Sequence, residues 1–306
     1  MRQAADTIVH TDGTKTALYC FKTEHEPVAS IVILHGMAEH HKRYQTFADY
    51  LLEQGFDVYL YDHRGHGTDK MTKELGYISP KGGYLLLIND GINIFNFIRK
   101  NGRGNKLFLF GHSMGSLVSR CIIQSYEHLD GVILSGTTYP SKLKLLPGIF
   151  LAAVIKKIYG PRHPSMLMDQ IIFGSKHYKK LRKRTAYDWL TRNNPIVGAY
   201  IHDPYCGFLC SISFYQDLLR LSLLAGTPRT MKKTPKKLPI FIISGDMDPV
   251  GNMGKEVTAL YKHYKKWNYE NVTMKLYPEC RHELLQELNA NEIMSDILSW
   301  IKTLIV

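Results

Sequence analysis

Cysteine is scarce in this 306-residue chain, and its residues show no paired spacing. The five cysteines are Cys20, Cys121, Cys206, Cys210 and Cys280. An odd count without paired spacing is not the disulfide framework of a small secreted protein, and reduced thiols are typical of a cytoplasmic one. We therefore expect a cytoplasmic protein that depends on its hydrophobic core.

Long apolar runs are also missing. The longest, residues 145–155, contains Pro147 and is too short to span a bilayer. Residues 1–11 hold no apolar segment of the kind found in signal peptides. We expect neither a transmembrane helix nor secretion.

Acidic residues are outnumbered, with 27 Asp and Glu against 39 Lys and Arg, a formal charge of +12. Such a surface attracts anionic partners. No signature of a nucleic-acid-binding module is present, so nucleic acid is not an expected partner. Two alternatives stay open: peripheral contact with an anionic membrane, or a basic surface with no charged partner. The sequence indicates no protein partner.

Motifs for nucleotide and metal chemistry are absent from the sequence as well. No phosphate-binding G-x-x-x-x-G-K-[ST] pattern occurs. His63 and His66 have no further ligands at useful spacing, and His282-Glu283 is not followed by the second histidine of a zinc protease. We expect neither a cofactor nor a metal.

What is present is a regular alternation of strand and helix patterns. Short apolar runs predict strands at 29–34, 56–61, 106–110, 131–136, 240–244 and 272–277. Helical spacing of apolar residues predicts helices at 44–54, 84–99, 253–266 and 292–305. Residues 7–10 and 17–21 predict a hairpin around Asp12-Gly13. This order predicts an α/β fold with a mostly parallel sheet and helices on both faces.

The alternation stops after Thr138 and returns at Leu238. Residues 139–237 are basic and aromatic, and their pattern predicts an irregular insertion over the carboxyl edge of the sheet. We expect a core made of residues 1–138 and 238–306, with 139–237 as an inserted cap.

The most informative stretch is 106–116. An apolar run leads into Gly111-His112-Ser113-Met114-Gly115, and a helical pattern follows. This strand–turn–helix context is the one that a nucleophile elbow requires, with glycines that let strand and helix approach around a strained serine. The sequence predicts Ser113 as a nucleophile.

A serine nucleophile needs a base and a group that orients the base. The loops after the last two predicted strands offer Asp246, Asp248 and His282. We expect His282 to be the base and Asp248 to be its partner, while Asp246 braces the turn after the strand. Backbone N–H groups of Met37 and Met114 are the expected oxyanion donors.

The sequence resembles the monoacylglycerol lipase and lysophospholipase branch of the α/β-hydrolase superfamily. The blocks that carry the resemblance are His35–His40 (HGMAEH), Asp62–Gly67 (DHRGHG) and 111–115. The resemblance covers about 1–137 and 238–306, and it places the triad on Ser113, Asp248 and His282. It implies a serine hydrolase that cleaves the acyl ester of a monoacylglycerol or lysophospholipid. A small-ester carboxylesterase, an aminopeptidase-like amidase and a non-catalytic ligand-binding protein stay open.

The insertion holds the candidate substrate residues. Residues 145–158 predict an amphipathic helix that covers an acyl channel, packs on the core or touches lipid. Residues 176–184 are strongly basic and either meet a phosphate headgroup or form a solvated face. We expect Asp203 and Phe208 near the pocket mouth, and Arg64 and His66 to brace the loops beside the nucleophile.

Overall fold

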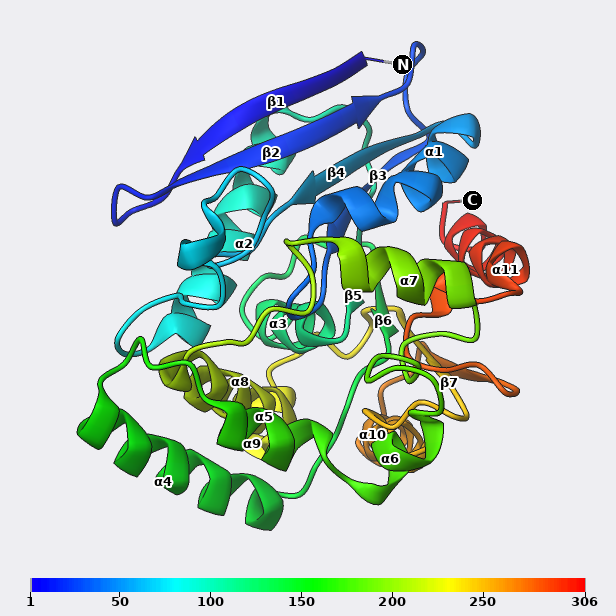
Figure 1. Ribbon diagram of the computed structural model, residues 1–306. Coiled ribbons are helices and arrows are strands. Elements are labelled where there is room, and N and C mark those ends of the chain that lie inside the picture. The colour runs from blue at the N-terminus through cyan, green and yellow to red at the C-terminus, as the bar shows by residue number, and fades with distance from the viewer. Residues whose placement is uncertain (1, 306) are drawn as a thin grey trace.

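A single eight-stranded sheet runs through the middle of the molecule (Figure 1). The computed structural model describes residues 2–305, with side chains from Ala5 onward. The strand order is β1-β2-β4-β3-β5-β6-β7-β8. The strands are β1 (Arg2–Val9), β2 (Lys15–Lys22), β3 (Ala29–Leu34), β4 (Phe56–Tyr61), β5 (Leu107–His112), β6 (Gly131–Ser135), β7 (Ile240–Gly245) and β8 (Val272–Tyr277).

Six of the strands form a parallel sheet, and a hairpin extends it at one edge. β1 pairs antiparallel with β2, and β2 pairs antiparallel with β4, whereas the remaining neighbours are parallel. The predicted hairpin is confirmed, and Gly13 takes a φ of 80° at its turn. A Gly at this position adopts a left-handed conformation without the steric cost that a side chain would add.

Helices cover both faces of the sheet, as the sequence predicts. On one face, α1 (Gln45–Glu53) and α11 (Ala290–Lys302) bury their apolar sides. On the other lie α2 (Gly83–Asn101), α3 (Met114–Ile122) and α10 (Lys255–Lys266). Short 3-10 helices η1 (His41–Tyr44), η2 (Thr72–Glu74) and η3 (Leu284–Gln286) lie in the loops. The fold is therefore an α/β-hydrolase fold with a core on each face of its sheet.

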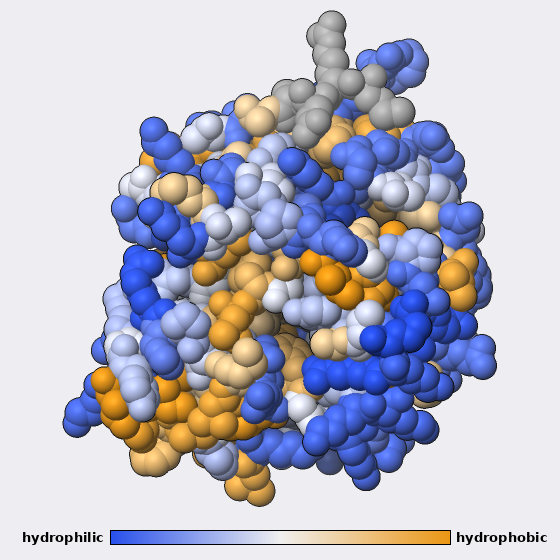
Figure 2. Space-filling view, viewed as in Figure 1, coloured by the Kyte–Doolittle hydropathy of each residue, from blue (hydrophilic) through white to orange (hydrophobic). Residues whose placement is uncertain are grey.

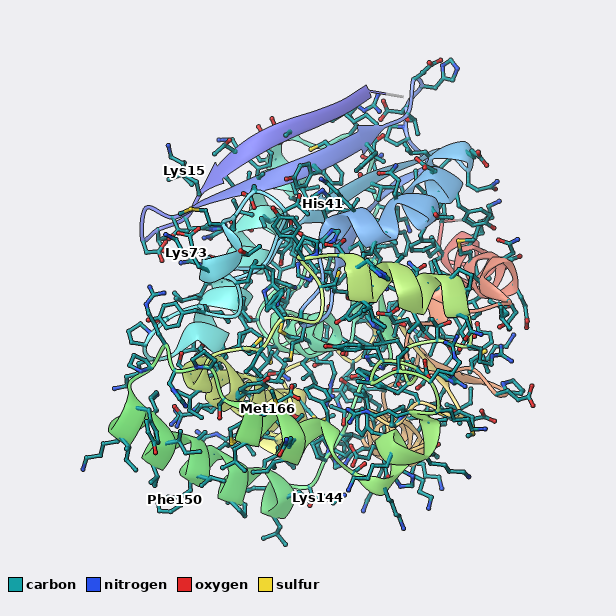
Figure 3. All side chains as sticks on the ribbon, viewed as in Figure 1. Lys15, His41, Lys73, Lys144, Phe150 and Met166 are labelled. Carbon is teal, nitrogen blue, oxygen red and sulfur yellow. The ribbon has the colours of Figure 1, made fainter. Side chains whose placement is uncertain are left out.

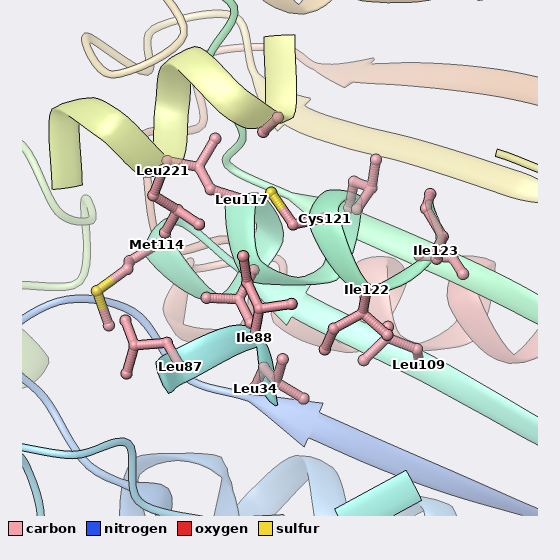
Figure 4. Packing of buried hydrophobic residues seen from close by; sticks show 14 of the residues in the cluster. Leu34, Leu87, Ile88, Leu109, Met114, Leu117, Cys121, Ile122, Ile123 and Leu221 are labelled. Carbon is pink, nitrogen blue, oxygen red and sulfur yellow. The ribbon is translucent and has the colours of Figure 1, made fainter. Parts of the chain in front are cut away.

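The helix that follows the candidate nucleophile lies at the centre of the larger core. Figure 4 shows Leu117 and Cys121 of α3 facing Leu221, with Ile122 close to Leu109 of β5. All nine residues of α3 are buried. Packing on every side fixes the helix, and with it the position of the residue that precedes it.

Six helices separate β6 from β7. They are α4 (Lys142–Tyr159), α5 (Met166–Phe173), α6 (Lys176–Leu181), α7 (Asn194–His202), α8 (Ile212–Gly226) and α9 (Pro228–Met231). The expectation of an irregular insertion is therefore wrong. Four of these helices have nine residues or fewer, which is too short for helical periodicity to stand out in the sequence.

The insertion is not a uniform layer above the sheet. α8 packs against α2 and α3, so it belongs to the larger core, and α4 packs on the outside of α8. The boundaries 1–138, 139–237 and 238–306 for core and cap stay a prediction. No helix within residues 2–305 combines the length and the apolar character needed to cross a bilayer.

Because β3, β5, β7 and β8 are parallel, their carboxyl ends lie at one edge of the sheet. The loops that leave this edge carry Met37, Ser113, Asp248 and His282. Binding sites of open α/β sheets form outside the carboxyl ends of the strands.

Candidate active site

Ser113 occupies a strained turn between β5 and α3. Its φ of 52° and ψ of −117° lie in a region that non-glycine residues rarely adopt, at a cost of about 1–3 kcal/mol. The turn is held in place by the Ser113 N–H, which donates to the Ser135 carbonyl at 2.9 Å. The side chain is partly exposed, while its neighbours are buried. This is the backbone geometry of a nucleophile elbow.

Two glycines make the turn possible. A Cβ on Gly115 would lie 2.3 Å from the Leu34 carbonyl oxygen, and one on Gly111 would lie 2.2 Å from Ser119 Oγ. Strand and helix therefore approach so closely that only glycine fits at either position. The expectation from the sequence, that these glycines allow close packing, is confirmed.

His282 and Asp248 meet as a buried pair. His282 Nδ1 lies 2.9 Å from Asp248 Oδ2, so Nδ1 carries the proton and Nε2 is left as an acceptor. Burial alone would lower the pKa of His282, but the adjacent Asp248 carboxylate outweighs burial and raises the pKa above 6.5. The imidazole is therefore held in the orientation that a general base needs.

The two aspartates after β7 have different surroundings. Asp248 is fully buried and accepts the Val250 N–H at 2.8 Å and the Ser244 hydroxyl at 3.3 Å. Asp246 instead accepts the Glu279 N–H at 2.7 Å, which ties the loop after β7 to the loop after β8. Asp248 is therefore the aspartate that contacts His282, whereas Asp246 braces the turn after β7.

Two residues enclose the His282 imidazole. The Trp189 ring lies 5.2 Å from the His282 ring between centroids, and the His112 ring lies 4.6 Å away. Burial and the neighbouring His282 lower the pKa of His112 to about 3, so this ring is neutral. Sequence reasoning missed Trp189, because nothing in residues 139–237 indicates which side chain reaches the core.

The loop after β3 presents the Met37 N–H between two fixed neighbours. The Gly36 N–H donates to the Glu39 carboxylate, and the Ala38 N–H donates to His66 Nε2 at 3.1 Å. Within residues 2–305 the Met37 N–H has no acceptor, and the same holds for the Met114 N–H at the start of α3. Two unpaired amides beside a serine fit the expected oxyanion hole.

His66 braces this loop, as expected, but Arg64 does not. Arg64 binds Asp90 of α2 and Asp12 of the β1–β2 turn, with Nη1 2.6 Å from Asp12 Oδ2. Its planar guanidinium matches two carboxylates at once, so it holds the hairpin onto α2 and lies away from the nucleophile. The prediction for Arg64 is wrong.

A buried charge network that the sequence analysis missed lies behind the same loop. Arg43 binds Glu283 through two hydrogen bonds of 2.5 and 2.7 Å, and Glu39 through one of 2.7 Å. Burial would raise the pKa of Glu39, but the Arg43 cation, the neighbouring histidines and the Gly36 N–H together outweigh burial and lower the pKa to about 2. The loop after β3 is thereby linked to the loop that carries His282. The spacing of Glu39 and Arg43, one turn apart, was the available signal.

Asp203 and Phe208 end up in different places. Phe208 lines a cavity beside Ser113, as expected. Asp203 lies outside the lining of that cavity and pairs with His40, whose Nε2 is 2.8 Å from Asp203 Oδ2. This pair ties the loop after β3 to the segment that follows α7.

His40, Asp203 and Cys206 are the candidate metal ligands within residues 2–305, with ligand atoms within 4.8 Å of one another. Burial raises the pKa of the Cys206 thiol, which therefore carries its proton. With His40 already hydrogen-bonded to Asp203, the trio fits a buried hydrogen-bonded pair beside a protonated thiol.

Two cavities open on Ser113. The larger, of about 580 Å³, is lined mostly by apolar side chains of α4, α5 and α8, among them Leu145, Leu151 and Leu219. The smaller, of about 260 Å³, contains His282 and is lined by polar and aromatic side chains. Lys144 lines the larger cavity and Met166 lines the smaller one, and both side chains are labelled in Figure 3.

Comparison with known proteins gives consistent matches over the whole chain. The model of a family described as "Serine aminopeptidase, S33" matches residues 25–289. A monoglyceride lipase of Mus musculus is 24% identical over 301 residues, covering 96% of this chain and 89% of that protein. Phospholipase YtpA of Bacillus subtilis is 23% identical over 269 residues, which cover 87% of this chain and 92% of that protein.

A solved structure is similar across its full length. A thermostable carboxyl esterase from Bacillus coagulans, in complex with glycerol, superposes with a TM-score of 0.88 at 26% identity and covers 100% of both chains. The loops that meet at the carboxyl edge of the sheet therefore belong to a known architecture.

Proposed function

The chain belongs to the serine aminopeptidase S33 family of α/β-hydrolases, and on that premise we propose that it hydrolyses the acyl ester of a lipid monoester at Ser113. Relatives named monoglyceride lipase and phospholipase place it among serine ester hydrolases. The proposed substrate is a monoacylglycerol or a lysophospholipid. The reaction needs no cofactor.

In the proposed mechanism, Ser113 Oγ attacks the ester carbonyl while His282 Nε2 takes its proton. Asp248 holds the imidazole and stabilises its positive charge. The N–H groups of Met37 and Met114 bind the oxyanion. His282 then protonates the leaving alcohol, activates a water molecule and returns the proton to Ser113 as the fatty acid leaves.

The observation that carries the proposal is the position of Ser113 on both cavities. The larger cavity has an apolar lining that suits an acyl chain, and the smaller polar cavity suits the alcohol part of the ester. A lipid monoester has this division into one long apolar part and one short polar part. An ester of a short acid would leave the larger cavity unfilled.

We further propose that α4 rests on a membrane surface when the enzyme takes up its substrate. α4 is apolar on two sides: Leu145 and Leu151 face the large cavity, while Leu143, Phe150 and Ile158 are exposed. Figure 2 shows this apolar surface at the lower edge of the molecule, and Figure 3 labels Phe150 and Lys144 there. Exposed apolar residues beside lysines are typical of interfacial helices.

The test is hydrolysis of p-nitrophenyl esters from acetate to palmitate by the wild type and by Ser113→Ala. We expect a rate maximum at medium or long chains and a loss of at least about 10³-fold in the variant. Labelling of Ser113 by a fluorophosphonate reports nucleophile activation independently of chain length. A maximum at acetate would favour the small-ester alternative. Hydrolysis of amides without hydrolysis of esters would favour the amidase alternative. If Ser113 is not labelled and no substrate is turned over, the ligand-binding alternative would be favoured.

A further inference from the structure

One cation in the smaller cavity forms no ion pair within the described residues, although its guanidinium lies 5.8 Å from the centroid of the Tyr178 ring. Arg182 is the one Lys or Arg among the described residues that line this cavity. Its Nη2 donates to the Phe173 carbonyl at 3.0 Å, while its Nε is buried without a hydrogen-bond partner in the described part of the chain. Arg184, two residues later, pairs with Asp188 at 3.1 Å, whereas Arg182 forms no ion pair within residues 5–305. A buried donor of this kind costs free energy unless a ligand satisfies it.

Two of the acids in the cavity are already neutralised. Glu39 and Glu283 are both bound by Arg43. Asp169 is the remaining acid of the lining; its Oδ1 accepts the Tyr215 hydroxyl at 2.9 Å, and it forms no ion pair within the described residues. The lining of the cavity therefore holds one cation and one anion that form no ion pair within the described residues.

Aromatic rings complete the wall. Phe173, Tyr187, Trp189 and Phe208 line the cavity together with Arg182 and Asp169. Aromatic faces attract alkylated ammonium groups through cation–π interactions. A glycerol group carries no charge for either side chain, whereas a phosphodiester with an ammonium group matches both.

We infer that the smaller cavity binds the zwitterionic headgroup of a lysophospholipid, with Arg182 on the phosphodiester and Asp169 and the aromatic wall on the ammonium group. This inference rests on the proposed function, because it assumes that the acyl ester lies at Ser113 and the acyl chain in the larger cavity. The three lysines of α6, Lys176, Lys179 and Lys180, are exposed, and Figure 2 shows hydrophilic surface over this part of the molecule. Their charge favours the arrival of a phosphate-bearing lipid.

The experiment compares kcat/KM for a lysophosphatidylcholine and for a monoacylglycerol with the same acyl chain in the same detergent. We define the ratio as kcat/KM for lysophosphatidylcholine divided by kcat/KM for the monoacylglycerol. We expect Arg182→Gln to lower this ratio by about 10-fold to 100-fold, since a charge-assisted hydrogen bond is lost for lysophosphatidylcholine only. Arg182→Lys should recover part of the ratio. Lys183 is exposed, and Lys183→Gln removes one positive charge just as Arg182→Gln does. This control should leave the ratio within about twofold of the wild-type value.

Asp169 has a separate readout. Asp169→Asn should lower kcat/KM for lysophosphatidylcholine relative to lysophosphatidic acid, which has no ammonium group. A test without variants is inhibition of p-nitrophenyl ester hydrolysis by the wild type: glycerophosphocholine should inhibit at a concentration at least about tenfold lower than glycerol does.

An unchanged ratio in Arg182→Gln, or hydrolysis of monoacylglycerol but not of lysophosphatidylcholine, would overturn the inference and leave the proposed function intact. Failure of the proposed function looks different: neither lipid would be hydrolysed, and the fluorophosphonate would not label Ser113.

Discussion

At the scale of single residues, the pair formed by His282 and Asp248 controls how the site responds to pH. A base must be neutral to accept the Ser113 proton. Because Asp248 raises the pKa of His282 above 6.5, we expect activity to fall as pH drops through that raised value. In the proposed mechanism, the carboxylate thus orients the imidazole and moves the acid limit of the reaction to higher pH.

The variant Asp248→Asn tests both effects of the carboxylate, the orientation of the imidazole and the raised pKa of His282, through separate measurements. We expect kcat to fall on the order of 10³-fold to 10⁴-fold, since the amide no longer fixes the tautomer. The acid limb of kcat/KM should also move to lower pH, because the carboxylate that most strongly raises the pKa of His282 is then gone while burial still lowers it. The measurement is a pH profile with p-nitrophenyl butyrate between pH 5 and 9.

The matched control is Asp246→Asn, two residues earlier and bonded to the Glu279 N–H instead of the histidine. It should keep most of the activity and the wild-type acid limb. A profile in which Asp246→Asn shows the shift and Asp248→Asn does not would contradict the assignment.

At the scale of elements, α4 is notable because it carries apolar side chains on two sides, for two different reasons. It is apolar on both sides because one side lines the large cavity and the other is exposed, with Leu143 83% and Phe150 72% accessible. Large apolar side chains are normally buried, so their exposure on one side of α4 is the feature on which the proposed membrane contact depends.

The double variant Phe150→Ser and Ile158→Ser tests whether the exposed side of α4 contacts a membrane. We expect co-sedimentation with vesicles of mixed phosphatidylcholine and phosphatidylglycerol to weaken about tenfold, because two apolar side chains no longer insert. Hydrolysis of water-soluble p-nitrophenyl butyrate reports whether the active site remains intact. Leu85→Ser, an exposed leucine on α2, is the control. Equal vesicle binding by the double variant and the wild type would contradict membrane contact through α4.

The elements also show what the sequence could and could not predict. Strand runs such as 29–34 and 56–61 are buried on both faces, so hydrophobicity alone marks them. Ser113, Asp248 and His282 follow such strands, and the order of the parallel sheet brings them to one edge. Trp189, Arg43 and Arg182 act through contacts made by the insertion and the loops. Those contacts depend on tertiary packing that no local pattern encodes.

At the scale of the whole molecule, four buried histidines make stability depend on pH. Burial, together with neighbouring histidines, lowers the pKa of His35, His63, His66 and His112 to about 3 in the folded protein. In the unfolded chain each would titrate near 6.5. Between these values the unfolded state binds more protons than the folded state, so the free energy of unfolding falls as pH drops below 6.5.

One group acts in the opposite direction. His282 has a raised pKa, so its contribution is fully present below pH 6.5 and is lost as pH rises through the raised value. The four buried histidines oppose this one, and His10 and His263, whose pKa values burial also lowers, act in the same direction as the four. Glu39, whose pKa is lowered to about 2, adds a further loss when pH falls from its usual value near 4.5 toward 2.

We expect urea denaturation to show a free energy of unfolding that falls by more than about 1 kcal/mol per pH unit between pH 6.5 and 5, since each buried histidine can contribute up to about 1.4 kcal/mol per unit. His63→Phe provides the internal check, because the ring nitrogens of His63 make no hydrogen bond within the described residues. Removing this titrating group should flatten the slope, since His63 then takes up no proton on unfolding and no longer lowers the pKa of His35. A free energy of unfolding that stays constant from pH 7.5 to 5 would contradict the buried, neutral state of this cluster. It would also contradict the fixed tautomer by which His66 accepts the Ala38 N–H and holds the loop that carries Met37.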